Sequence, residues 1–332
     1  MNNFDRGQQT EDRENPRHPR SSVLRLVHAD WSVSPSKRWL AQATRQPDGR
    51  FLVDDLRPVG RLSGFWPSLR VGLPQDALTV AGFDFPIGLP LAYTQQVGVT
   101  DFVALLSQLG KGEWADFYRV AETADEIGLK RPFYPQRPGG TRRQHLLDAL
   151  NMDHINQLRR RCDLPGDHHA AAAPLFWTLG AQQVGKAAIS GWRDVLAPAL
   201  REKDTAVTLW PFTGEWDDLC QPCQTIVVEA YPAAYCWPLG IKSVSKRDPV
   251  SRKKACMTLL KWAATNDVGL VDWVATAVRD GFGPKPAGED PFDALVGLLG
   301  LLKPILHDEL ITTPPETAVR QVEGWIFGLE KQ

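Results

Sequence analysis

Residues 78–84 read LTVAGFD, an apolar run that ends in a carboxylate, and this stretch decides the fold class of the chain. Residues 23–30 (VLRLVHAD) have the same form. Both runs are apolar enough for the centre of a sheet, and the long segment between them predicts two neighbouring parallel strands. Asp30 and Asp84 should therefore lie side by side, about 8 Å apart or less if one metal site includes both.

Short runs extend this sheet. The segments that follow residue 30 alternate between apolar and polar residues across turn-rich links, which predicts a three-stranded antiparallel meander. Two later apolar runs predict that the sheet resumes near the middle of the chain. These four segments are residues 37–44, 50–56, 205–210 and 224–230.

Helical patterns fill most of the remaining sequence. Residues 91–204 carry four of them, at 101–109, 113–127, 144–161 and 180–202, and we interpret this region as a helical insertion between strands. Four more follow, at 249–265, 268–280, 290–302 and 317–329. The predicted organisation is one α/β domain over residues 23–332, after a polar and disordered tail at residues 1–22.

Composition excludes some classes of protein. With 332 residues, 43% of them hydrophobic, the chain can bury a large core, and a net charge of -1 gives no general attraction to nucleic acid or membrane. The polar start lacks the apolar core of a secretory signal, and no run reaches the roughly 18 apolar residues that a membrane span needs. Five cysteines fit a reducing compartment. We expect a cytoplasmic protein with no membrane contact.

Carboxylates close several of the core segments. Burying a carboxylate costs several kcal/mol unless it is paired, protonated or bound to a metal. Acids that gather at the ends of core elements therefore predict a divalent cation, Mg²⁺ or Mn²⁺, held by oxygen ligands. The candidate catalytic residues are Asp30, Asp84, Glu229, Asp290 and Asp293, of which all but Glu229 are candidate metal ligands.

Each acid also has a structural explanation. Asp30 and Asp84 lie where turns begin, and Asp side chains often bond to their own backbone there. The sequence Asp290-Pro-Phe-Asp293 is typical of a helix start, with an N-cap, a proline and a first-turn acid. Two acids three residues apart also share one helix face and can ligate one ion. Glu229 follows a strand, where it either pairs with a basic side chain or takes part in the metal site.

A basic segment follows Glu229. Residues 242–261 carry seven Lys or Arg side chains against a single acid. Such a run is commonly a solvated helix face, but its place beside a candidate site acid also favours phosphate binding. The candidate phosphate-binding residues are Lys246, Arg252 and Lys254, and the arginines at 142, 143 and 159–161 extend the same basic surface in this interpretation.

Other motifs are weak. Cys220 and Cys223 form a lone CxxC, and a structural zinc site needs a second pair at suitable spacing. The sequence has no glycine-rich loop of the P-loop or dinucleotide type and no nucleophilic elbow.

The order of these motifs resembles the ribonuclease H-like superfamily. An Asp-ended strand, two hairpin strands, a second acid-ended strand and a late helix starting with EDPFDAL occur in that order. More closely, HADWS, GFDFPIGLP, LFWTLGAQQVGKAAI, WPFTG, VVEAYPAAY and SKRDPVSRKKA are similar to domain-of-unknown-function family 429, a family of predicted ribonuclease H-like nucleases. The similarity covers about residues 23–305.

The resemblance implies a mixed five-stranded sheet flanked by helices. It also implies acids on the first strand, the fourth strand and the last helix that bind two Mg²⁺ or Mn²⁺ ions, here Asp30, Asp84, Asp290 and Asp293. Glu229 matches the VVEAYP motif of the smaller family and has no counterpart among the catalytic acids of Holliday-junction resolvases.

We therefore expect a two-metal phosphodiesterase that acts on DNA or RNA, with Asp30 bridging the ions. One alternative is a nucleotide-binding phosphotransferase of the actin and sugar-kinase type. It needs a phosphate hairpin rich in Gly and Ser or Thr after the first strand, and here Ser32, Ser34 and Ser36 occur without glycine. The other alternative is a binding protein without catalysis that keeps the acids for folding.

Overall fold

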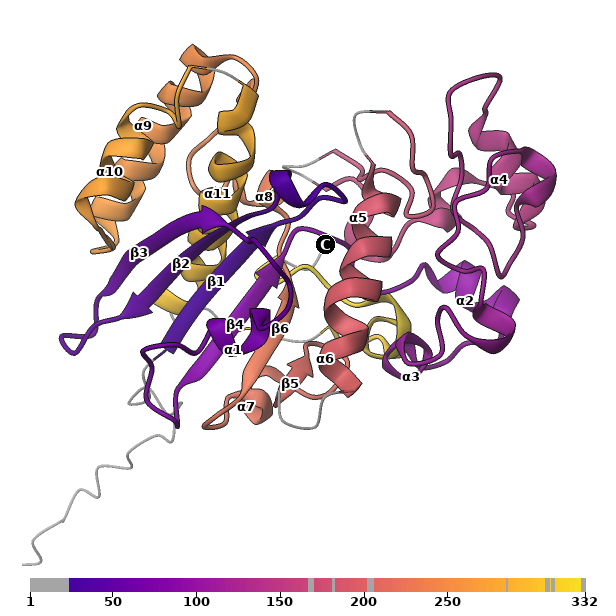
Figure 1. Cartoon of the computed structure of the whole chain (residues 1–332), viewed down its shortest axis with the longest axis horizontal. Coiled ribbons are helices and arrows are strands. Elements are labelled where there is room, and N and C mark those ends of the chain that lie inside the picture. The colour runs from indigo at the N-terminus through magenta and orange to yellow at the C-terminus, as the bar shows by residue number, and fades with distance from the viewer. Residues whose placement is uncertain are drawn as a thin grey trace, which may run out of the picture.

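The computed structural model describes residues 24–166, 170–180, 183–201, 206–284, 286–307, 311 and 314–329. The predicted tail, residues 1–22, lies outside the described residues. The described chain is a mixed α/β structure in which helices flank a seven-stranded sheet of order β5-β6-β4-β1-β2-β3-β7 (Figure 1). The strands are β1 Leu24–Asp30, β2 Trp39–Arg45, β3 Phe51–Pro58, β4 Leu78–Phe83, β5 Val207–Leu209, β6 Thr225–Glu229 and β7 Gly269–Leu270.

Strand directions confirm the central prediction. β1 and β4 are parallel neighbours, and Ala29 lies opposite Phe83, so the acids after these positions share one edge of the sheet. β2 is antiparallel to both β1 and β3, which is the predicted meander. All other pairs are parallel, so β2 alone runs against the rest.

The helices vary from one turn to five. They are α1 Phe65–Ser68, α2 Leu91–Val97, α3 Phe102–Leu106, α4 Arg143–Ala149, α5 Val184–Gly191, α6 Ala197–Arg201, α7 Trp216–Leu219, α8 Pro232–Tyr235, α9 Pro249–Thr265, α10 Asp272–Arg279 and α11 Glu289–Leu306. A π-helical turn at Trp192–Leu196 joins α5 to α6.

Two layers of helices cover the two faces of the sheet. Figure 1 shows α9, α10 and α11 together on one side and α5, α6 and the predicted insertion on the other. Because side chains alternate along a strand, Leu26 packs into the core under α11 while Val27 packs into the core of the insertion. His28 and Asp30 share the face of Leu26, so Asp30 points toward α11.

The insertion is less helical than its sequence predicts. The prediction of a helix at residues 113–127 is wrong, since only 3₁₀ turns form there, at Gly112–Trp114 and Ala124–Glu126. The Ala121 N–H donates to the Phe133 carbonyl at 2.7 Å, and this link to another segment replaces helical hydrogen bonding. The helix expected at 144–161 stops at α4, and Asn151 beyond it has a φ of 54°.

The last predicted helix, residues 317–329, is also mostly absent. A π-helical turn at Val319–Glu323 ends at Gly324, whose φ of 70° turns the chain away. The chain then runs beside β6, where Ile326 bridges Glu229. Among the described residues, no helix is both long and apolar enough to cross a membrane.

Candidate functional site

Asp30 and Asp84 meet at the edge of the sheet where β1 and β4 end. The Asp84 N–H donates to the Ala29 carbonyl at 3.0 Å, which extends the β1–β4 ladder by one residue. The charge of Asp84 in turn raises the pKa of Asp30, after burial and the charge of Asp293, as expected for two carboxyl groups that lie close together. The predicted juxtaposition is therefore present.

The turn that carries Asp84 is held at several points. Trp192 donates its indole N–H to the Pro86 carbonyl at 2.6 Å, and the Ile87 N–H donates to the Glu229 carboxylate at 2.7 Å. Gly88 has a φ of 136°, and a Cβ there would lie 2.0 Å from the Glu323 carbonyl oxygen. These contacts fix Asp84 before any ligand arrives, which a functional site requires.

Helix α11 brings Asp290 and Asp293 to the same edge. Small residues let α11 approach the sheet and α8, since a Cβ on Gly297 would lie 2.1 Å from His28 of β1 and one on Gly300 would lie 2.0 Å from Tyr235 of α8. The N-cap of α11 is Gly288, and no side chain caps it. The prediction that Asp290 caps this helix is therefore wrong, and its carboxylate makes no cap hydrogen bond.

Lys246 lies among these acids. Its ammonium nitrogen is 2.7 Å from each carboxylate oxygen of Asp293. The contact with Oδ2 has the geometry of a hydrogen bond, whereas buried Oδ1 makes only the ionic contact. Burial lowers the pKa of Lys246, but Asp293 outweighs burial and the net pKa is raised. The ammonium stays charged.

Burial and mutual repulsion raise the pKa values of the acids. Burial raises the pKa of Asp30 well above its ordinary value, and the charges of Asp293, Asp84 and Asp290 raise it further. The pKa of Asp84 is raised to about 7, first by burial and then by Asp293. The pKa of Asp290 rises to about 6, mainly by burial, while Lys37 opposes the rise. Burial is the largest cause in each case, and the charges of neighbouring acids add to it.

Arg252 fixes the backbone of Lys246. Its fully buried guanidinium donates to the carbonyls of Lys246, Gly281 and Gly283 at 2.5, 2.7 and 2.7 Å. It therefore ties the Lys246 segment to the chain that leads into α11. We correct the prediction that Arg252 orients a phosphate, because a side chain with no exposed surface and three carbonyl partners is structural. Lys254 is exposed on α9 and makes no ion pair with these acids in the part of the chain that the structure describes.

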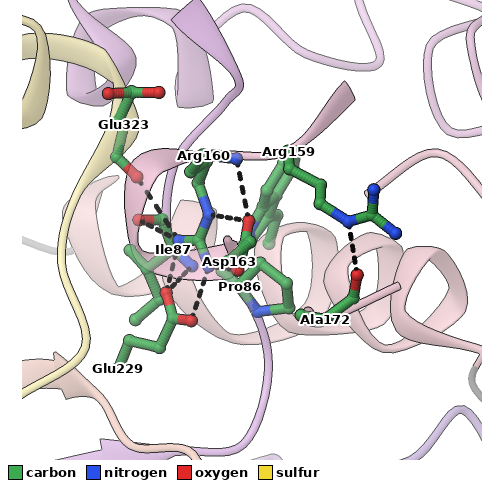
Figure 2. Close-up of polar contacts among 9 residues, drawn as sticks. Pro86, Ile87, Arg159, Arg160, Asp163, Ala172, Glu229 and Glu323 are labelled. Atoms are coloured by element: carbon green, nitrogen blue, oxygen red, sulfur yellow. Dashed lines mark hydrogen bonds and ion pairs between the residues drawn. The ribbon is translucent and has the colours of Figure 1, made fainter. Parts of the chain in front are cut away.

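Glu229 belongs to a separate buried ion cluster. Figure 2 shows Arg160 between Glu229 and Asp163. The guanidinium nitrogens of Arg160 lie 2.5 and 2.7 Å from the two carboxylate oxygens of Glu229 and 2.9 Å from each carboxylate oxygen of Asp163. Of the two roles that the sequence left open for Glu229, the structure shows the ion pair. The arginine at 160 is thus not part of a basic surface.

A cavity of about 310 Å³ opens between the Asp84 turn and the start of α5. Its walls include Trp31, Phe85 and Tyr231, and its polar groups include Asp84 and Lys186. Burial, with a smaller effect of the Asp84 charge, raises the pKa of Tyr231 to about 12, so this phenol keeps its proton. The volume is at the lower end of the roughly 300–1,000 Å³ range of ligand sites.

Apart from Asp84, the sequence analysis assigned no role to these cavity residues or to Lys37. Four of them lay within quoted motifs: Trp31 in HADWS, Phe85 in GFDFPIGLP, Tyr231 in VVEAYPAAY and Lys186 in LFWTLGAQQVGKAAI. The only available signal was their position inside a motif, since a single Tyr or Lys in a mixed segment has no distinguishing pattern.

The acids suit a hard cation, since their donors are carboxylate oxygens and one of them, Asp293 Oδ1, is buried without a hydrogen bond. As the described side chains stand, no three acids, imidazoles or thiols are grouped closely enough to hold a metal. Lys246 explains part of this absence, because its ammonium is paired with the carboxylate of Asp293.

Comparison with known proteins adds no identification. No family model matches the chain, and neither the curated proteins nor the solved structures contain a match. The functional argument therefore rests on the geometry above.

Proposed function

We propose that this protein is a metal-dependent phosphodiesterase that cleaves nucleic acid, built on a ribonuclease H-like fold related to domain-of-unknown-function family 429. The observation that carries the proposal is the meeting of Asp30, Asp84, Asp290 and Asp293 at one sheet edge. The order β6-β4-β1-β2-β3, with β2 alone antiparallel, supports the fold. β5 and β7 are then additional edge strands.

The chemistry follows from the charges. Hydrolysis adds water to phosphorus and breaks the bond to one ester oxygen, which leaves as a hydroxyl after it takes a proton. A bound Mg²⁺ or Mn²⁺ supplies the Lewis acidity that this reaction needs. Asp30, Asp84 and Asp290 would hold the ion, because they are preorganised at the end of a strand, in a fixed turn and on a helix, and because a cation would neutralise charges that burial and neighbouring acids disfavour.

The surroundings suit a nucleotide unit. The cavity beside Asp84 offers aromatic walls at Trp31, Phe85 and Tyr231, and stacking on aromatic rings is the usual way to hold an unpaired base. Lys186 in the cavity wall and exposed Lys37 near Asp290 supply cations for phosphates. They take the place of Arg252 in the predicted phosphate-binding set. The five free cysteines support the cytoplasmic location that we propose.

A cleavage assay tests this function. End-labelled single-stranded DNA, single-stranded RNA and duplexes are incubated with the protein and Mg²⁺, Mn²⁺ or a chelator. We expect cleavage of at least one substrate with either ion, none with chelator, and none by the Asp30→Asn variant. Absence of cleavage in every condition, combined with hydrolysis of ATP, would favour the phosphotransferase alternative.

A further inference from the structure

We infer that the ammonium of Lys246 takes the place of a second metal ion, so that the acidic centre holds one divalent cation and one fixed lysine. This inference rests on the proposed metal-dependent function and replaces the two-metal arrangement that the sequence predicted. It names a lysine whose side chain, 31% exposed, lies among carboxylates rather than in solvent.

The first argument is competition for Asp293. Both of its oxygens lie 2.7 Å from the Lys246 nitrogen. Divalent ions bind carboxylate oxygens at about 2.0 to 2.6 Å, so an ion on the same oxygens would lie within a few ångströms of the ammonium. Like charges this close repel each other, and the repulsion is twice as large when one of them belongs to a divalent ion. Asp293 therefore serves the lysine or a metal, not both.

The second argument is preorganisation. The carbonyl of Lys246 accepts from Arg252, and the N–H of the preceding Ser245 donates to Ser251 Oγ at 2.9 Å. Asp248, two residues on, caps α9 by accepting from the N–H groups of Val250 and Ser251. A lysine on a free surface loop has no such anchors. Backbone contacts before and after Lys246 thus fix its segment, and this keeps the ammonium next to Asp293.

The remaining acids define where the metal goes. Asp30 and Asp84 end neighbouring parallel strands and have no ion pair with a basic side chain among the described residues, while the charge of Lys246 acts on both from a longer distance. One divalent ion at this pair would leave Lys246 paired with Asp293 beside the metal. A fixed cation there would lower the energy of negative charge that develops near it during hydrolysis.

Metal stoichiometry tests the inference without an activity assay. The full-length protein is titrated with Mn²⁺ in a calorimeter, and bound Mn²⁺ is counted after desalting. We expect one ion per chain in the natural protein and two in Lys246→Met, which keeps most of the length of the side chain but removes its charge. Lys246→Gln serves as the second variant if Lys246→Met is unstable. Lys254→Met, a change at an exposed lysine of α9, should stay at one.

The outcomes separate the two proposals. Two ions in the natural protein would overturn the role of Lys246 and leave the metal-dependent function intact. One ion in the natural protein and still one in both Lys246 variants would show that the lysine does not hold the second position. No bound Mn²⁺ in the natural protein would contradict the proposed function, and the inference with it.

Discussion

The guanidinium of Arg160 lies 2.5 and 2.7 Å from the two carboxylate oxygens of Glu229, and this contact separates Glu229 from the other acids. Glu229 ends β6, next to the strand that leads to Asp84, and still has its charge balanced by a different partner. Proximity in the sheet therefore does not make every strand-end acid a metal ligand.

Glu229→Gln should destabilise the protein more than it affects metal binding. The variant leaves Arg160 with Asp163 alone, and breaking a buried pair costs roughly 3 to 5 kcal/mol. We expect a loss near the low end of that range, because Asp163 still neutralises Arg160. Urea unfolding measures the loss in the free energy of unfolding, and Mn²⁺ titration of the folded variant should give an unchanged affinity.

The exposed pair between Arg119 and Asp116 provides the control for this experiment. Arg119→Ala removes a contact of similar geometry from solvent and should leave stability unchanged within error. A Glu229→Gln protein that unfolds like the natural one but has lost Mn²⁺ binding would reassign Glu229 to the metal site.

Asp30→Asn should abolish metal-dependent cleavage while the melting temperature holds or rises. The amide keeps the size of the side chain but removes the charge that we place on the metal. Without metal, it also removes repulsion with Asp84 and Asp293, which stabilises the fold. Cleavage at the natural rate by this variant would remove Asp30 from the mechanism.

The metal-free protein should lose stability as pH rises from about 4 to about 7. The pKa of Asp84 is raised in the folded state from its ordinary value of 3.8 to about 7, so between these pH values the folded state binds a proton that the unfolded state releases. That contribution is complete below pH 4 and is lost as pH passes the folded pKa. Asp290, with a pKa raised to about 6, acts in the same direction.

The comparison with Asp84→Asn isolates this effect. Urea denaturation in chelator, from pH 4 to 8, gives the free energy of unfolding of the natural protein and of Asp84→Asn. The difference between these two values should change steadily as pH rises from about 4 to about 7. Saturating Mn²⁺ should reverse the trend, since the metal binds the ionised form. A difference that is independent of pH in chelator would show that Asp84 has an ordinary pKa.

Asp293→Glu should lower the affinity for Mn²⁺ or disturb the ion pair with Lys246. Asp290→Ser should leave the free energy of unfolding nearly unchanged. Asp290 makes no cap hydrogen bond, so the fold loses little when its carboxylate is removed. Extending Asp293 by one methylene moves its oxygens away from positions fixed by α11 and Lys246. We expect at least a tenfold fall in affinity for Asp293→Glu, since even indirect metal contacts are worth 10- to 100-fold. Unchanged affinity in both variants would leave the start of α11 with a structural role alone.

Filling the cavity should block substrate without affecting metal. Ala187→Phe places a ring in the cavity wall formed by α5, opposite the Asp84 turn. We expect weaker binding and slower cleavage of single-stranded oligonucleotides, with Mn²⁺ affinity retained. Ala264→Phe adds the same bulk at an exposed position of α9 and should have no effect. Equal cleavage by both variants would exclude the cavity from substrate binding.

Local sequence pattern predicted the sheet well, because its strands are short apolar runs with acids or turns at their ends. The adjacency of β1 and β4 followed from their apolar character, and the bounds of α9 match the predicted residues 249–265. Asp248 and Pro249 give this helix a clear start. The insertion was harder, because its apolar residues face a core built by distant segments. Trp114 and Phe117 are buried there without a continuous helix.

The candidate site was predictable in part for the same reason. Acids that end strands can be read from the chain, so Asp30, Asp84 and Asp293 come together as expected. The roles of Arg160 and Arg252 could not be read, because an arginine becomes structural only when distant carbonyls or carboxylates surround it. The partners of Arg160 include Glu229, 69 residues away, and those of Arg252 include Gly281 and Gly283. Lys246 is the opposite case, since its position before α9 was noted but its partner on α11 was not.

A crystal of the natural protein soaked in Mn²⁺ tests the central claim most directly. The anomalous scattering of manganese should give a peak in contact with carboxylate oxygens of both Asp30 and Asp84, at ligation distances of about 2.0 to 2.6 Å. Asp290 should lie toward the same ion, and Lys246 should remain paired with Asp293. A map without an anomalous peak near Asp30 and Asp84 at saturating Mn²⁺, or with its only peak elsewhere, would contradict the account.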